Sequence, residues 1–235
     1  MATILALDTS TPACSVALNI DGVVLEDFRL APRLHNDLIL PMVDQILSQA
    51  SLTLADLDAI AFGRGPGSFT GLRISAGVVQ GLAYGADLPV IPVSTLEALA
   101  LEGFQKTGEN NWLAALDARM GEIYLGGYYV NKIDGQYLID PLLKERVVKP
   151  ESLSTFDVSF NGVGSGWCYE NILTPLLASK PEHVFVDLAP RAACIAELAV
   201  LSFAKEEFVP SYEAIPTYLR DEITWEKQAP RIGKR

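Results

Sequence analysis

The sequence predicts an α/β protein made of two copies of one unit, each a mixed β-sheet with flanking helices. The expected strands and helices follow the same order twice along the 235 residues, which indicates an internal duplication. Two segments also recur: residues 5–8 (LALD) resemble residues 114–117 (AALD), and the strand and glycine loop at 62–69 resemble those at 160–167. With 49% hydrophobic residues, the chain has enough apolar side chains for a substantial core.

Three strands are expected at the start of the first half, at 4–7, 15–20 and 23–30. Asp21-Gly22 between the last two is a two-residue hairpin signal. Apolar residues at helical spacing then predict a helix over 35–50, in which Pro41 marks the first turn or a kink.

The remainder of the first half alternates strands with helices. A short buried strand at 59–62 leads into a glycine-rich loop and a helix over 70–84. A strand at 90–93 is followed by a helix that runs to Ala100, with Ser94 as its N-cap and Glu97 completing a capping box.

The second half is expected to begin after the polar, glycine-containing stretch at 103–111. Its predicted elements are strands at 122–130 and 136–148 around an Asp134-Gly135 turn, the glycine loop at 160–167, a strand at 184–186 and a helix over 191–207. The predicted organisation is an N-terminal subdomain with the partner-binding helices (1–105), a C-terminal subdomain (106–220) and a tail expected to be mobile (221–235).

Charge and composition exclude several classes of function. The net charge of −11 argues against direct, tight binding of nucleic acid, which needs a basic patch, although contact through a partner remains open. No apolar run approaches the roughly 20 residues that span a membrane, and the N-terminus has no signal-peptide pattern. Because the three cysteines are scattered, a reducing compartment is expected, and the cytoplasm is the predicted location.

The glycine loop Gly63–Arg73 matches no common phosphate-binding motif. Ser68 stands where a P-loop has lysine, and Thr70 stands where the dinucleotide fingerprint has glycine or alanine. Two interpretations stay open: backbone N–H groups meet an anion at the start of the helix, or Ser68 or Thr70 caps that helix. With the hairpin after the first strand, the candidate nucleotide-like loops, functional or vestigial, comprise Asp8, Thr9, Ser10, Gly65, Gly67, Ser68, Thr70 and Gly71.

A second glycine pattern follows on the helix itself. Gly77, Gly81 and Gly85 recur every four residues and share one face, at a cost of about 1 kcal/mol each relative to alanine. Close packing explains such a stripe, either on the protein's own sheet or on another protein. Because the apolar stripe of the 36–50 helix looks too broad for burial on one side, we predict a partner interface of Leu38, Met42, Ile46, Leu72, Arg73, Gly77, Val78, Gly81 and Gly85, which would also favour homodimers in the absence of the partner.

Two units that each open with a strand ending in aspartate resemble the actin-like ATPase (ASKHA) architecture, which has a ribonuclease-H-like fold in each half. In detail the chain resembles the TsaB (YeaZ) family of that superfamily. The segments that carry the resemblance span the chain and are LALDTS at 5–10, LPMVD at 40–44, GPGSFTGLR at 65–73, PVSTL at 92–96, LDAR at 116–119 and PTYLR at 216–220.

The resemblance implies a non-catalytic subunit in the modification of tRNAs that read codons starting with A. In that family a paralogue, TsaD, transfers threonylcarbamoyl to the adenosine beside the anticodon, and a small ATPase, TsaE, completes the complex. ATP and threonylcarbamoyl-AMP are used by the complex, whereas no cofactor is assigned to this chain, and it is expected to meet tRNA only through its partners.

The histidines agree with the absence of a catalytic metal site in this chain. The sequence has two, His35 and His183, far apart and without a His-Glu-x-x-His motif, so a metalloprotease or a histidine-pair metal site is not expected. His35 is expected at the start of a helix. The alternative function is a stand-alone nucleotide-binding enzyme of the actin-like ATPase or sugar-kinase class, in which Asp8 would orient a metal or a water.

Overall fold

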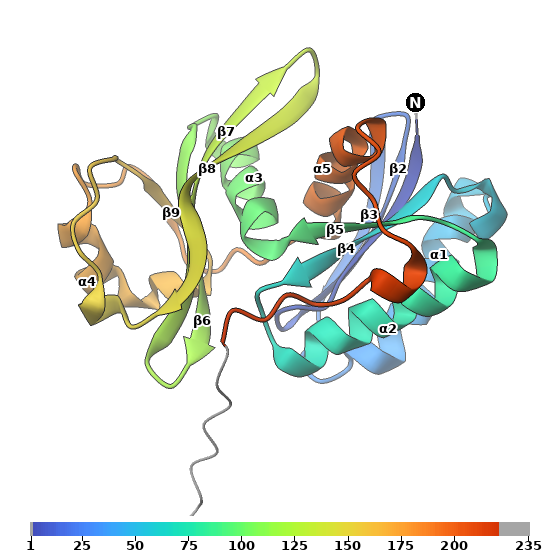
Figure 1. Cartoon of the computed structure of the whole chain (residues 1–235), viewed down its shortest axis with the longest axis horizontal. Coiled ribbons are helices and arrows are strands. Elements are labelled where there is room, and N and C mark those ends of the chain that lie inside the picture. Colours follow the sequence, from blue (N-terminus) through green and yellow to red (C-terminus); the bar gives the residue numbers. More distant parts are fainter. Residues whose placement is uncertain (1, 221–235) are drawn as a thin grey trace, which may run out of the picture.

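The computed structural model describes residues 2–220 and contains, within that range, two five-stranded mixed sheets (Figure 1). The first sheet has the order β3-β2-β1-β4-β5, and the second has the corresponding order β8-β7-β6-β9-β10. In the order given, the first three strands of each sheet pair antiparallel with one another, and the fourth strand pairs parallel with both the third and the fifth. The predicted duplicated α/β fold, an actin-like architecture with a ribonuclease-H-like unit in each half, is therefore confirmed.

The strands of the first sheet are β1 (Thr3–Asp8), β2 (Ala13–Ile20), β3 (Val23–Leu30), β4 (Ala59–Gly65) and β5 (Val90–Ser94). The helices of this half are α1 (His35–Ala50), α2 (Phe69–Ala86) and α3 (Thr95–Thr107). The second sheet consists of β6 (Asn111–Arg119), β7 (Glu122–Ile133), β8 (Gln136–Val148), β9 (Asn161–Val163) and β10 (Val184–Phe185). Its helices are the single-turn α4 (Glu170–Leu173) and the longer α5 (Ala192–Ala204), and short 3-10 turns include η3 (Ser165–Tyr169) and η5 (Ser211–Glu213).

Both Asp-Gly hairpins form as predicted. The backbone φ angles are 51° and 90° at Asp21 and Gly22, and 50° and 82° at Asp134 and Gly135. Positive φ at both central residues is the requirement of the tight turn whose twist matches that of the flanking strands.

The α3 helix is longer than predicted. It continues to Thr107 and ends at Gly108, whose φ is 80°, so most of the stretch expected to separate the two halves is helical. Gly103 lies inside this helix, where a Cβ would come within 2.7 Å of the Trp112 ring. This glycine therefore permits close packing and does not mark a loop.

Each sheet is covered in part by a helix that comes from the other half of the chain. α1 and α2 pack on one face of the first sheet, whereas its other face is covered by α5, which comes from the second half of the chain (Figure 1). Conversely, α3 packs mainly on β6 and β7. The predicted division after residue 105 separates the two sheets but not the helices that cover them. The proposed tail at 221–235 lies outside the described residues, and no helix within 2–220 is long and apolar enough to cross a membrane.

A carboxylate from the first sheet fixes the start of α5. Glu26 of β3 is largely buried, and its Oε1 accepts hydrogen bonds from the Ser15 hydroxyl at 2.9 Å and the Ala193 N–H at 3.1 Å. Its Oε2 forms an ion pair with Arg191 and accepts the Arg191 Nε–H at 2.8 Å. The Ala192 N–H donates to Ser15 Oγ at 2.9 Å, so β2 and β3 together satisfy two of the free N–H groups at this helix end.

We expect Glu26→Gln to lower the free energy of unfolding by about 1–3 kcal/mol, because one amide cannot accept from Ser15 and Ala193 and also neutralise Arg191. Chemical denaturation monitored by circular dichroism measures this change. The control is Asp27→Asn on the same strand, where the carboxylate pairs with the more exposed Arg29 and the expected loss is below about 1 kcal/mol. Equal losses in the two variants would contradict the anchoring role of Glu26.

Candidate functional site

The glycine loop and the hairpin after β1 lie in direct backbone contact. The Ser68 N–H donates to the Ser10 carbonyl at 2.7 Å, and the Thr9 hydroxyl donates to the Gly71 carbonyl at 2.7 Å. A Cβ at Gly67 would lie 2.6 Å from the Ser10 carbonyl oxygen, and one at Gly71 would lie 1.9 Å from that of Thr9. The structure thus brings the candidate nucleotide-like residues together, but the contact leaves no room for a phosphate between Gly67 and Ser10.

Ser68 caps α2. Its Oγ accepts the Gly71 N–H at 3.4 Å, and its carbonyl accepts the Leu72 N–H at 2.9 Å. Thr70 lies exposed in the first turn of the same helix. The sequence left open whether this loop binds an anion or caps the helix, and the geometry shows Ser68 as the helix cap.

Asp8, at the end of β1, is enclosed by the protein. Its Oδ1 accepts hydrogen bonds from the Ser10 N–H at 3.0 Å and the Ser10 hydroxyl at 2.8 Å. Its Oδ2 has no partner among the described residues and lies over Gly63, where a Cβ would be 2.0 Å away. Burial raises the pKa of Asp8 to about 7, with the Ser10 hydrogen bonds opposing the shift.

A buried polar cluster that the sequence did not predict joins the two sheets. Glu145 of β8 accepts hydrogen bonds from the Tyr128 hydroxyl, at 2.9 Å, and from the Ser94 hydroxyl, and Arg64 at the end of β4 lies 3.6 Å from its second oxygen. Glu97 lies close by, and burial, followed by the charge of Glu145, raises its pKa to about 7. The members come from five elements spread over residues 64–145, so no local pattern could have indicated the cluster.

The glycine face of α2 points away from the protein. Among residues 2–220, a Cβ at Gly77, Gly81 or Gly85 would meet nothing within 4 Å, whereas the sheet side of the helix buries Leu72, Ser75, Ala76, Val79 and Ala83. Beside this face, α2 and the start of α1 border an open groove of about 440 Å³, lined by Asn36, Phe69, Thr70, Arg73, Ile74, Gly77 and Val78. The stripe does not pack on the protein's own sheet.

Part of the predicted interface is corrected by the structure. Met42, Ile46 and Leu72 are at most 1% exposed, so they offer no surface to a partner. Met42 and Ile46 belong to the core under α1 and α2. The expectation that the apolar stripe of α1 exceeds the available internal surface was wrong, because α1 packs on β2, β3 and α2 at once and these neighbours cover it. The predicted positions that reach the surface, wholly or in part, are Leu38, Arg73, Gly77, Val78, Gly81 and Gly85.

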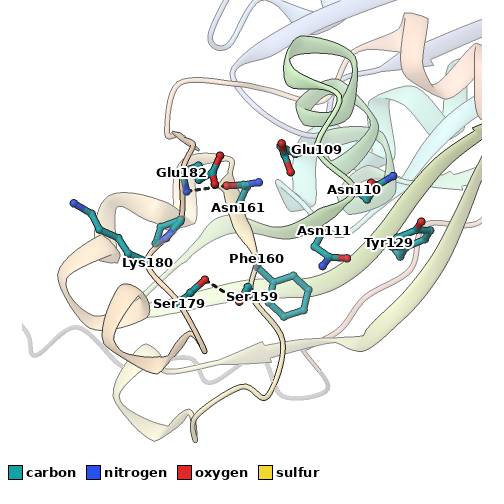
Figure 2. Close-up of a pocket in the computed structure, with 11 residues that line it drawn as sticks. Glu109, Asn110, Asn111, Tyr129, Ser159, Phe160, Asn161, Ser179, Lys180 and Glu182 are labelled. Atoms are coloured by element: carbon teal, nitrogen blue, oxygen red, sulfur yellow. Dashed lines mark hydrogen bonds between the residues drawn. The ribbon is translucent and has the colours of Figure 1, made fainter.

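A separate polar pocket of about 260 Å³ lies in the second half, beside the start of β6 and β9 (Figure 2). Its amide side chains hold its own walls together. Asn161 Oδ1 accepts the N–H groups of Glu182 and His183, both at 3.0 Å, and Asn110 Nδ2 donates to the Val130 carbonyl at 2.7 Å. Asn110 and Asn161 therefore stabilise the segments that line the pocket.

The histidines have local structural contacts. His35 is the first residue of α1, as expected, and its Nε2 lies 2.8 Å from the Thr11 carbonyl oxygen and 3.1 Å from that of Ala13. His183 stacks on Phe185 with ring centroids 5.8 Å apart. Among residues 2–220, no group of three or more histidine, cysteine, aspartate or glutamate side chains is arranged to hold a metal ion.

Asp8 should make the stability of the protein depend on pH. Because its pKa is raised in the folded state, folded protein binds the proton more tightly than unfolded protein, and the free energy of unfolding falls as pH rises from about 4 to about 7. One such group contributes a slope of at most about 1.4 kcal/mol per pH unit. Asp8→Asn should flatten the slope in urea titrations across this range, and the exposed control Asp44→Asn should not. An unchanged slope in Asp8→Asn would show that the buried carboxyl does not bind this proton.

Comparison with known proteins places the chain in a family. The family model described as "TsaD: tRNA N6-adenosine threonylcarbamoyltransferase" matches residues 22–227. The chain is 42% identical to the tRNA threonylcarbamoyladenosine biosynthesis protein TsaB of Haemophilus influenzae, over 96% of each chain. It is 43% identical to the protein of the same name from Escherichia coli, over 95% of this chain and 97% of that one. The solved structure of YeaZ from Pseudomonas aeruginosa superimposes with a TM-score of 0.85 at 42% identity, over 93% of this chain and all of the other. With the duplicated fold and the closed glycine loop, these matches show that the chain belongs to the TsaB (YeaZ) family of the actin-like ATPase superfamily.

Proposed function

We propose that this chain acts in tRNA threonylcarbamoyladenosine biosynthesis as the non-catalytic subunit that binds and activates the catalytic paralogue. The partner is a TsaD-type transferase, which works with a TsaE-type ATPase in the cytoplasm, and the chain forms homodimers when the partner is absent. The names of the relatives support the pathway, and the match to the TsaD family supports a partner of the same superfamily.

The exposed glycine face of α2 is the observation that carries the partner-binding role. Three glycines in a helix cost about 3 kcal/mol relative to alanine, and none of Gly77, Gly81 and Gly85 makes a contact beyond its own helix that a Cβ would prevent. A partner helix can approach such a face closely because the interaxial distance depends on the side chains between two helices. The groove beside it adds the apolar side chains of Ile74 and Val78 and the charge of Arg73.

The closed glycine loop supports the absence of catalysis in this chain. The backbone of Gly67 and Gly71 lies against Ser10 and Thr9, and Asp8 is fully buried. In this proposal ATP and threonylcarbamoyl-AMP are bound by the other subunits, and the chain contributes a surface.

The alternative is a stand-alone nucleotide-binding enzyme, and the free Oδ2 of Asp8 at the end of β1 is the feature that favours it. The two functions differ in affinity for ATP. Isothermal titration of the isolated chain with Mg-ATP should detect no binding below about 1 mM, because the contact between Gly67 and Ser10 leaves no room for a phosphate at the glycine loop. A micromolar dissociation constant that Asp8→Asn abolishes would support the alternative.

Gly81→Leu should abolish or greatly weaken association with the catalytic subunit while the chain stays folded. Overpacking at a tight helix contact costs about 1–3 kcal/mol, which corresponds to a loss of affinity of roughly 5- to 150-fold. The melting temperature should hold or rise, since leucine is the better helix former and position 81 opens to empty space. Calorimetry on the variant and pull-down or titration with the co-purified subunit measure the two effects.

Two controls accompany this variant. Gly81→Ala adds one methyl group and should weaken binding less than Gly81→Leu does. Lys106→Leu adds a leucine to an exposed position of α3, away from the groove, and should leave binding unchanged. Full tRNA modification supported by a folded Gly81→Leu protein would refute the proposed interface.

Isolated protein should bind tRNA weakly, because a chain with a net charge of −11 supplies few cations to neutralise phosphates. Gel-shift titration at physiological salt should give no complex at sub-micromolar protein. A sub-micromolar complex formed by this chain alone would contradict the expectation that tRNA is contacted only through the partners.

A further inference from the structure

Residues 208–220, here named the strap, form an irregular segment that follows α5. Apart from the short turn η5, the strap has no helix or strand of its own. It leaves α5 on the first sheet, runs along α2 and reaches the turn between β6 and β7 of the second sheet (Figure 1). Contacts to other elements must therefore hold it in place.

The first half of the chain binds the strap at three points. Val209 and Val90 exchange backbone hydrogen bonds of 2.8 Å. Ala214 is fully buried in the core under α1 and α2, and its carbonyl accepts from Gln80 of α2 at 3.1 Å. Thr217 donates its N–H to the Arg64 carbonyl at 2.7 Å and accepts from the Arg64 guanidinium at 3.0 Å.

The next contact belongs to the wall of the groove. Arg73 donates from Nε to the Tyr218 hydroxyl at 3.1 Å, and its guanidinium lies 3.6 Å from the centre of the Phe69 ring. The rings of Phe69 and Tyr218 are 5.5 Å apart. Because Phe69 and Arg73 line the groove, a partner in the groove touches the same side chains that hold the strap.

The last contact reaches the second half. Arg220 donates to the Ala118 carbonyl at 3.2 Å and forms an ion pair with Glu122, on the two sides of the β6–β7 turn. Arg64, which holds Thr217, also lies 3.6 Å from Glu145 of β8. The strap thus joins Phe69 and Arg73 of the groove to the second sheet through three consecutive residues, 218–220.

We propose that the strap couples the α1–α2 groove to the position of the second half relative to the first. A helix seated in the groove fixes Phe69 and Arg73, these fix Tyr218, and Arg220 then holds the β6–β7 turn. Coupling between two sites is reciprocal, so a strap tied to the second half also favours the groove conformation that binds the partner. The identity of the partner rests on the proposed function above, whereas the coupling within the chain does not.

The coupling can be measured first in the isolated protein by amide hydrogen exchange. Arg73→Ala should raise the exchange rate of the Thr217 amide and of the 118–122 turn by about tenfold or more, although Arg73 touches neither. Arg119→Ala is the control, since its side chain is 84% exposed on the same turn and pairs locally with Asp117. Changes confined to α2 in Arg73→Ala would overturn the coupling.

The second measurement uses the complex. Arg220→Ala, which lies outside the groove, should weaken binding of the catalytic subunit by about 5- to 20-fold, and partner binding should slow exchange at Thr217 in the wild type. Wild-type affinity in Arg220→Ala together with unchanged Thr217 exchange on binding would overturn the proposal. A wild-type chain that binds no catalytic subunit would instead refute the proposed function, and the exchange rates of the isolated Arg73→Ala protein would still decide the coupling.

Discussion

The direct backbone contact between the glycine loop and the hairpin after β1 determines most of what this structure presents to other molecules. A Cβ atom at Gly67 would collide with the carbonyl oxygen of Ser10, and one at Gly71 would collide with that of Thr9, so only glycine fits at these two positions. The contact fixes where α2 begins, and through α2 it fixes the groove beside α1. It also leaves no room for a phosphate between Gly67 and Ser10.

Much of the fold could be predicted because its signals are local. The 35–50 helix and the 23–30 strand have the expected bounds, and both Asp-Gly turns adopt the left-handed backbone that such pairs favour. The α3 helix was predicted too short because Gly103 resembles a helix stop in sequence, whereas its function is to admit the Trp112 ring. A glycine required by a distant contact has no local signature.

The candidate site could be predicted only in part, for the same physical reason. Asp8 and the glycine loop could be grouped as one candidate site from the sequence. The structure places them together because β1 and β4 are parallel neighbours that end at the same edge of the sheet. It did not indicate that Met42 and Ile46 are buried, because that depends on how α1, α2 and β2 share one core. The cap that Glu26 gives to α5 joins residues more than 160 positions apart. Such contacts follow from topology and not from spacing.

The glycines between Gly63 and Gly85 fall into two physical classes, and the difference argues for a partner. A Cβ at Gly63, Gly65, Gly67 or Gly71 would come within 3 Å of another part of the chain, so the fold itself requires these glycines. A Cβ at Gly77, Gly81 or Gly85 would meet nothing, and these positions have ordinary helical backbone in which alanine is the more stable residue. Residues 2–220 give no reason for this second class, which supports the proposal that a helix of another molecule packs there.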